Sequence, residues 1–232
     1  MIDLYALTSP NVQKIFIMLE ECELPYNIKT VDVWNAEQFT PEFTAVNPLQ
    51  KVPAIVDSEG PDGKPYTVIE SGAILIYLAE KTGKFIPHEP LKRYDVIQWL
   101  MVQMANLGPM SGQLVHFSKF AGPGQDYGIS RYRTVVNKLF DLYEQRLAQR
   151  PYVIGDEYTI ADIAAFPWLR NNELLAIDLG TRPHVKAYVD KLNERSAVKR
   201  AMAHVAQLKS SRNNATEDNK DRIYGRGQYA RA

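Results

Sequence analysis

The sequence contains one cysteine, Cys22, among 232 residues. A single cysteine excludes an internal disulfide and a Cys-x-x-Cys redox pair, which favours a reducing compartment. No stretch approaches the roughly 20 consecutive apolar residues needed to span a bilayer. The first residues also lack the basic start and apolar core of a signal peptide. From these absences we expect a soluble, cytoplasmic protein with no membrane partner.

The chain also lacks an excess of charge of either sign. Its 27 basic and 27 acidic residues give a formal net charge of +0. Nucleic acids and anionic membranes attract proteins through an excess of positive charge, so neither is predicted as a partner. No metal site is predicted. A chain of 232 residues with 45% hydrophobic residues can form two modest domains.

Residues 50–80 carry the pattern on which the functional prediction depends. An apolar run at 54–57 follows Pro53, and a turn around Gly63 leads to a second run at 66–69. A helical pattern begins at Ser71. This order predicts a strand, a hairpin turn, a second strand and a helix.

Three features of this segment indicate a binding site. Proline cannot donate a hydrogen bond to a neighbouring strand, so we expect Val52, just before Pro53, to be extended with its backbone N–H and C=O free. Ser71 is the predicted N-cap of the next helix, whose positive end favours a carboxylate. Glu70 can accept a hydrogen bond from an ammonium group. Together these groups suit a small zwitterionic peptide such as glutathione.

In this order and spacing, the residues resemble the thioredoxin-like half of cytosolic glutathione transferases. The resemblance rests on Lys51, Val52 and Pro53, followed by Glu70 and Ser71. It implies a cis peptide bond before Pro53 and a Glu70–Ser71 pair that holds the γ-glutamyl end of glutathione. Taken singly, each feature is also common in proteins without such a ligand, because serine often serves only as a cap.

The first third of the chain predicts a βαβ unit. A strand at 2–6 is followed by a helix with an apolar stripe and by a strand at 26–33, which gives a parallel pair. Ser9 and Asn11 lie at the turn into the helix, where a hydroxyl or amide donor would stabilise a thiolate. In the resembled family this turn faces the glutathione sulfur. Both residues can equally serve as turn residues, and Tyr5 is an alternative activator.

A narrower resemblance is to the nu-class glutathione transferases of bacteria and the related fungal proteins that resemble the yeast nitrogen-regulation prion. It rests on the following segments: Ser9 to Asn11, Gln38 to Phe43, Asn47 with Pro48, and Lys51 to Pro53. It implies that Gln38 and Lys51 contact the glycine end of glutathione and that Val52 pairs with its cysteinyl backbone. It also implies a homodimer in which Arg131 reaches the site of the neighbouring subunit. The class more often has threonine at the position of Ser9.

We therefore predict an α/β thioredoxin-like N-terminal domain (βαβ-ββα) followed by an all-α C-terminal domain. The predicted bounds are 1–84 for the first domain, 85–92 for a linker, 93–209 for the helical domain and 210–232 for a polar, mobile tail. Tyr224 and Tyr229 could anchor that tail. Gly108 and Pro109 predict an interruption in the first long helix.

Other residues of the predicted helical domain are assigned either to folding or, as candidates, to a pocket for a second substrate. Thr159 and Asp162 form a predicted capping box, which we assign to folding. The pocket candidates, each equally explained by packing, are Trp99, Gln103, His116 and Phe117.

The leading functional hypothesis is a homodimeric enzyme that reduces disulfides with two molecules of glutathione and no cysteine of its own. Cys22 lies about three turns from the helix start, too far for the helix dipole to activate it. Conjugation and peroxide reduction are weaker expected activities. A glutathione-binding regulatory protein and a structural protein that binds no thiol remain as alternatives.

Overall fold

The computed structural model describes residues 1–225, and the chain forms two compact units. The first unit combines Met1–Ile74 with the chain from Arg200 onward, and the second is Leu75–Lys199. These units differ from the predicted domains 1–84 and 93–209, which remain predictions about domain boundaries. Within residues 1–225, no helix is long and apolar enough to cross a membrane.

The first unit is built on a four-stranded sheet. Its strands are β1 (Ile2–Ala6), β2 (Tyr26–Thr30), β3 (Ala54–Asp57) and β4 (Tyr66–Ile69), in the order β2-β1-β3-β4. β1 pairs in parallel with β2 and antiparallel with β3, and β3 pairs antiparallel with β4. The predicted parallel pair and hairpin are confirmed.

Two helices follow strands of this sheet, α1 (Pro10–Cys22) after β1 and α3 (Ser71–Thr82) after β4. α1 forms because its apolar stripe is fully buried and because Ser9 caps its start. The stripe consists of Val12, Ile15, Phe16 and Leu19. α3 ends before Gly83, whose φ of +65° is the left-handed conformation that glycine adopts readily.

The connection between β2 and β3 folds into three short helices. These are η1 (Val33–Asn35), η2 (Glu37–Phe39) and α2 (Pro41–Val46). Asp32 caps η1 by accepting from the Trp34 backbone N–H at 3.1 Å, and Thr40 caps α2 by accepting from the Phe43 N–H at 3.3 Å. Val33, predicted to end the second strand, therefore begins a helix.

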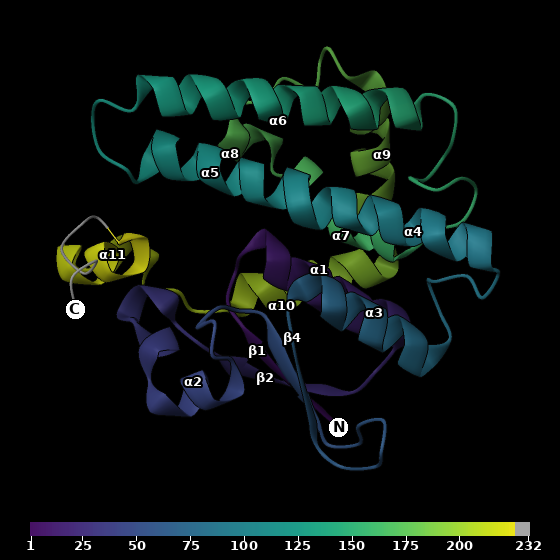
Figure 1. Ribbon diagram of the computed structural model, residues 1–232, viewed down its shortest axis with the longest axis horizontal. Coiled ribbons are helices and arrows are strands. Elements are labelled where there is room, and N and C mark those ends of the chain that lie inside the picture. The colour runs from purple at the N-terminus through teal and green to yellow at the C-terminus, as the bar shows by residue number, and fades with distance from the viewer. Residues whose placement is uncertain (226–232) are drawn as a thin grey trace. The chain divides into compact units, whose positions relative to one another are not determined.

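The second unit is helical, as predicted (Figure 1). Its elements are α4 (Pro90–Val102), η3 (Gln103–Leu107), α5 (Gly108–Lys119), α6 (Asp126–Leu147), α7 (Ile160–Leu169), α8 (Asn172–Leu175) and α9 (Pro183–Asn193). The interruption predicted at Gly108 takes the form of η3, a π-helix that joins α4 to α5. Every residue of α7 is buried, so this helix forms the core of the unit.

The predicted capping box at the start of α7 is confirmed. The buried Asp162 carboxylate accepts from the backbone N–H of Thr159 at 2.9 Å and from that of Val153 at 2.8 Å. Burial raises the pKa of Asp162 to about 6, while these donors act to lower it. The box therefore fixes the loop before α7 as well as the helix start.

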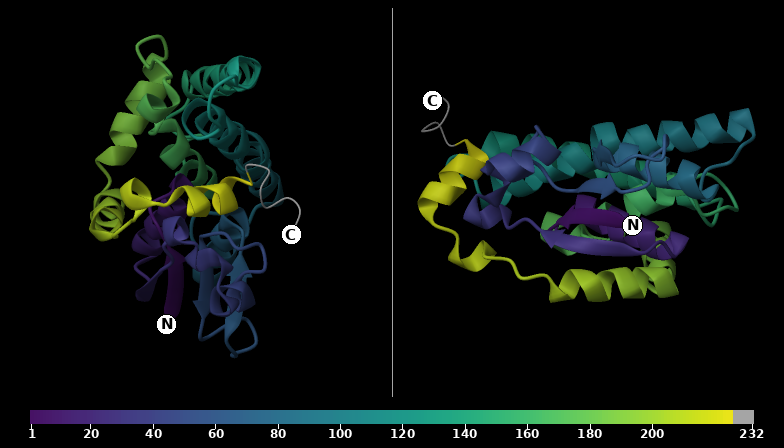
Figure 2. Two further views of the ribbon diagram at one scale, coloured as in Figure 1. Left: turned by 90° about the vertical axis from the view of Figure 1, so that its left-hand side faces the viewer. Right: turned by 90° about the horizontal axis from the view of Figure 1, so that it is seen from below.

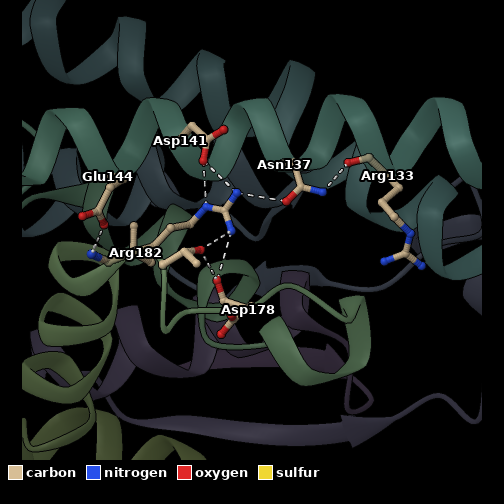
Figure 3. Close-up of polar contacts among 8 residues, drawn as sticks. Arg133, Asn137, Asp141, Glu144, Asp178 and Arg182 are labelled. Atoms are coloured by element: carbon tan, nitrogen blue, oxygen red, sulfur yellow. Dashed lines mark hydrogen bonds and ion pairs between the residues drawn. The ribbon is translucent and has the colours of Figure 1, made fainter.

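A second polar cluster joins α6 to the segment that precedes α9 (Figure 3). Arg182 is buried, and its side chain donates to Asp141 Oδ1 at 2.8 Å and to Asn137 Oδ1 at 2.9 Å. The same guanidinium group donates to the Asp178 carbonyl at 3.0 Å. Because each contact joins parts of the second unit, we assign this cluster to folding.

The prediction of a mobile tail from residue 210 is wrong for its described part, residues 210–225. After α10 (Ser196–Gln207), the chain forms η4 (Arg212–Asn214) and α11 (Glu217–Tyr224), and Figure 2 shows its course in yellow. The Tyr224 ring lies 6.2 Å from the Trp34 ring, and the Asn219 amide donates to the Trp34 carbonyl at 3.0 Å. These contacts stabilise a segment that has few apolar residues of its own. Tyr229 lies outside the described residues.

Candidate functional site

The strand register brings the predicted site segments to one end of the sheet. Tyr5 lies opposite Ala54, Ala54 lies opposite Ile69, and Ala6 lies opposite Thr30. The turns that follow β1, β2 and β4 and the turn that precedes β3 are therefore close to one another at this end of the sheet. They carry Ser9, Asn11, Gln38, Lys51, Val52, Pro53, Glu70 and Ser71.

The turn after β1 presents a hydroxyl group at the start of α1. Ser9 has extended backbone angles, φ −67° and ψ 155°, and its Oγ accepts from the Val12 N–H at 3.4 Å. Because the oxygen accepts this bond, the hydroxyl hydrogen can be donated elsewhere. Asn11 is the second residue of α1 and is partly exposed. The positive end of the helix dipole and the Ser9 hydroxyl together favour an anion at this turn.

The turn before β3 leaves a peptide group open. The Val52–Pro53 peptide bond is cis, as the resemblance implied. The Asn47 side-chain amide donates to the Lys51 carbonyl at 2.6 Å, which fixes the turn, and the Lys51 side chain is exposed. Within residues 1–225, the backbone N–H and C=O of Val52 have no hydrogen-bond partner. They can pair with an extended peptide, as in the addition of a strand to a sheet edge.

Glu70 joins β4 to α3 in a conformation that is unusual for its residue type. Its φ of 68° is in the left-handed region, which costs a non-glycine residue about 1–2 kcal/mol. Its carbonyl accepts from the Ile74 N–H at 2.9 Å, so Glu70 occupies the N-cap position. The prediction that Ser71 is the N-cap is thus wrong by one residue, because α3 begins at Ser71. The Glu70 side chain is exposed beside the helix start.

A lysine that the sequence reasoning missed contacts this helix start. Lys14 of α1 is fully buried, and its Nζ donates to Ser71 Oγ at 3.2 Å. Burial lowers the pKa of Lys14 to about 7, and the Glu70 carboxylate acts in the opposite direction. The signal in the sequence was a lysine placed between Val12 and Ile15, within the apolar stripe of the predicted helix.

Gln38 of η2 is the member of the predicted set whose burial is hardest to explain by folding alone. The residue is 4% exposed, and its Oε1 atom is buried without a hydrogen-bond partner in the described chain. An unsatisfied buried acceptor costs about 1–3 kcal/mol. A ligand that donates a hydrogen bond would remove this cost.

The C-terminal segment braces the loop that carries Gln38. The Ser211 backbone N–H donates to the Asp32 carboxylate at 2.9 Å, and the Arg222 guanidinium lies 5.0 Å from the Phe39 ring. Both contacts lie within the first unit. They hold the start of η1, which precedes Gln38, and the end of η2, which contains it.

Two residues considered as sources of reactivity are placed elsewhere. The Tyr5 ring packs against the Phe43 ring at a centroid distance of 5.8 Å. Cys22 is the last residue of α1 and is buried, at the opposite end of the helix from Ser9. This placement favours Ser9 and Asn11 over Tyr5 or Cys22 as the groups that face a reacting sulfur.

The remaining predicted residues lie in the second unit. Arg131 is exposed on α6 and forms no ion pair or hydrogen bond with the other described residues, whereas Arg133 donates to the Ala176 carbonyl at 3.3 Å. Trp99 packs against the Tyr143 ring at 5.4 Å. Of the two arginines, Arg131 is therefore the one available to another molecule.

The pocket candidates next to Trp99 also take part in packing. Gln103 is fully buried in η3. The Phe117 ring stacks on the Tyr132 ring at 5.4 Å and contacts the His116 ring at 5.3 Å. These contacts agree with the packing interpretation that the sequence left open, and the role of these residues toward a second substrate stays a prediction.

Comparison with known protein families identifies both parts of the chain. Residues 8–81 match the glutathione S-transferase N-terminal domain, and residues 125–196 match the glutathione S-transferase C-terminal domain. The chain belongs to the glutathione S-transferase family. The strands and turns described above thus belong to the N-terminal, thioredoxin-like part of a transferase fold, as predicted.

Several known proteins are similar in sequence to this glutathione S-transferase over most of its length. Disulfide-bond oxidoreductase YfcG of Escherichia coli (strain K12) is 43% identical over 216 residues, which is 93% of this chain and 100% of YfcG. A glutathione transferase family member from Pseudomonas fluorescens pf-5, solved with two glutathione bound, is 44% identical with a TM-score of 0.82, over 87% of this chain and 92% of that one. A glutathione transferase from Pseudomonas putida, solved with one glutathione disulfide bound per subunit, is 39% identical with a TM-score of 0.82, over 87% and 90%.

Proposed function

We propose that this protein is a nu-class, glutathione-dependent disulfide reductase that uses two glutathione molecules and no cysteine of its own. In this proposal it acts as a homodimer in the cytoplasm. The relative YfcG is named as a disulfide-bond oxidoreductase, and the family member from Pseudomonas fluorescens pf-5 was solved with two glutathione bound. Both findings support this reaction.

The first glutathione lies along the end of the sheet. The Val52 backbone pairs with its cysteinyl residue, while Glu70 accepts from the ammonium group of its γ-glutamyl end. The carboxylate of that end binds Ser71 and backbone N–H groups at the start of α3. Gln38 and Lys51 contact the glycine end, and Arg131 of one protomer reaches the site of its partner.

The sulfur of this glutathione then points to the turn at Ser9 and Asn11. A hydroxyl or amide donor that binds the thiolate stabilises it relative to the thiol, which lowers the pKa of the thiol. The dipole of α1 acts in the same direction. These residues therefore raise the fraction of bound glutathione that is ready to attack.

The reaction consists of two thiol–disulfide exchanges. The first thiolate attacks one sulfur of the substrate disulfide, forming a mixed disulfide and releasing the other sulfur as a thiolate that takes up a proton. A second glutathione thiolate attacks the glutathione sulfur of the mixed disulfide, forms glutathione disulfide and releases the second substrate thiolate, which also takes up a proton. Two glutathione molecules thus supply the two electrons and two protons that reduce one disulfide.

The observation that carries this proposal is the meeting of three groups at one end of the sheet. The open peptide of Val52 lies between the start of α1, with Ser9, and the start of α3, with Glu70 and Ser71. The chain's one cysteine is buried at the other end of α1. A bound peptide thiol is therefore the source of sulfur chemistry that fits this geometry.

The decisive assay measures reduction of a mixed disulfide of glutathione and 2-mercaptoethanol by the wild-type protein and by Ser9→Ala and Asn11→Ala variants. A hydrogen bond to a charged group corresponds to roughly a tenfold to hundredfold effect, so each variant should lose kcat/KM by about that factor. Ser9→Thr, which keeps both the cap and the hydroxyl, should retain most of the activity.

Two controls separate chemistry from folding and from binding. Glu89→Ala removes the N-cap of α4, a helix of the second unit, and should lower stability without a comparable loss of kcat/KM. Calorimetry with glutathione tests binding apart from turnover. Unchanged rates in both Ser9→Ala and Asn11→Ala would reject these residues as thiolate stabilisers, and binding without turnover in the wild type would indicate a regulatory protein.

A further inference from the structure

Lys14 is a charged residue of the first unit that the proposed function does not use. It is fully buried, and its Nζ lies 3.2 Å from the oxygen of Ser71, which is itself 4% exposed. Lysine is rarely buried so completely, because removing its charge from water is costly. The contact joins the middle of α1 to the first residue of α3.

The direction of this hydrogen bond depends on the charge of Lys14. An ammonium group can only donate, so the Ser71 oxygen must accept, and the Ser71 hydroxyl hydrogen cannot point to Lys14. A neutral amine has a lone pair and can accept that hydrogen instead. In the second case the lone pairs of the Ser71 oxygen would face an incoming carboxylate and repel it.

We propose that Lys14 is a positioning residue for the γ-glutamyl carboxylate of glutathione. Its ammonium form orients the Ser71 hydroxyl as a donor to that carboxylate and places a positive charge behind the first turn of α3. This inference rests on the proposed function, because it requires glutathione to lie at Glu70 and Ser71.

The charges around Lys14 allow this effect to depend on pH. Burial lowers the pKa of Lys14 to about 7, so both of its forms are populated near neutrality. Glu70, at the junction of β4 and α3, acts on Lys14 and favours its ammonium form. Glu20, further along α1, is engaged with Arg200 and His204 of α10. A bound carboxylate should further favour the ammonium form, so binding should take up a proton.

S-Methylglutathione is the suitable probe, because its sulfur cannot titrate. Its affinity is measured by calorimetry for wild type, Lys14→Met and Lys14→Arg. Between about pH 6 and pH 8.5 the wild type should lose roughly tenfold in affinity as a charge-assisted hydrogen bond is lost. Lys14→Arg, which stays charged, should bind tightly throughout. Lys14→Met should bind weakly at every pH.

Proton uptake provides an independent readout. Calorimetry near neutral pH is repeated in two buffers with different ionisation enthalpies, which reveals the number of protons bound with the ligand. The wild type should take up a fraction of one proton, and Lys14→Met should take up none. Any pH dependence that remains in Lys14→Met belongs to the ammonium group of the ligand.

The outcomes separate this inference from the function on which it rests. If wild type and Lys14→Met bind S-methylglutathione with the same pH profile, the role of Lys14 is rejected while the glutathione site stands. If the wild type fails to bind at any pH, both are rejected. If Lys14→Met does not fold, a Lys14→Arg variant that loses affinity in parallel with the wild type overturns the inference.

Discussion

Several residues of the candidate site are held in states that an unconstrained chain avoids. Glu70, and Gln50 next to Lys51, have positive φ angles of 68° and 55°, and the buried Gln38 has a side-chain oxygen with no hydrogen-bond partner among residues 1–225. Such local costs gather where function requires a fixed geometry. None of them was evident from the sequence, because each depends on the backbone path and not on residue type.

Lys14 should also make the stability of the protein depend on pH. Its pKa is about 7 in the folded chain and about 10.4 in an unfolded one. Between these values the unfolded chain holds a proton that the folded chain has released, so this residue makes the free energy of unfolding rise with pH. Below about pH 7 both states are charged, and the full cost of burying the ammonium group remains.

Replacing Lys14 by methionine removes this dependence. The free energy of unfolding of Lys14→Met minus that of wild type, measured with urea, should decrease by about 2 kcal/mol from pH 7 to pH 9. The difference between the two proteins cancels the titration of all other groups. Parallel stability profiles over this range would show that Lys14 is not a buried titrating group.

At the scale of elements, periodicity and capping predicted the regular segments well. The buried stripe and Ser9 cap defined α1, and Thr159 with Asp162 defined the start of α7. The segment after β2 was missed because its three helices are too short to show an apolar period. They depend instead on caps such as Asp32 and Thr40, which also occur in ordinary turns.

The junction of η3 and α5 gives a prediction at this scale. A Cβ atom at Gly108 would lie 2.8 Å from the Gln103 amide nitrogen and 3.4 Å from the Trp168 indole nitrogen. Overpacking of this kind costs about 1–3 kcal/mol. Gly108→Ala should therefore be destabilised by about that amount relative to Gly112→Ala.

Gly112 is the matched control because it lies on the same helix and meets the same tryptophan. A Cβ there would have its nearest neighbour at 3.9 Å, an ordinary contact. Alanine is also the better helix former by up to about 1 kcal/mol, so Gly112→Ala should be neutral or stabilising. Chemical unfolding of both variants makes the comparison, and equal stabilities would show that the junction can absorb a methyl group.

At the scale of the whole molecule, the fold class and the family followed from the sequence, whereas long-range pairs did not. Lys14 and Ser71 are separated by 57 residues, and Asn219 reaches Trp34 across 185. The polar composition of the C-terminal segment led to the prediction of a mobile tail. The prediction failed because composition does not reveal the distant partners that stabilise this segment. Only a three-dimensional structure identifies such pairs.

The proposed dimer can be tested by mixing two inactive variants. If Arg131 serves the site of the partner subunit, a mixed dimer of Arg131→Ala and Ser9→Ala contains one site with both residues intact. Mixing after reversible dissociation should restore about a quarter of wild-type activity, because half of the dimers are mixed and each has one intact site. Arg133→Ala paired with Ser9→Ala is the control, since Arg133 contacts its own unit. Failure to complement, with Arg131→Ala itself fully active, would exclude a role for Arg131 in the partner's site.

The return of the C-terminal chain to the first unit has a consequence for synthesis. The His204 ring stacks on the Phe16 ring at 6.3 Å, and Arg200 pairs with Glu20 at 2.7 Å, so α10 contacts α1. On the ribosome, that surface of α1 is uncovered until α10, whose Arg200 lies 180 residues beyond Glu20, has been synthesised. The sheet and α1 are therefore made well before α10 can pack on α1, and the nascent chain must avoid aggregation in that interval.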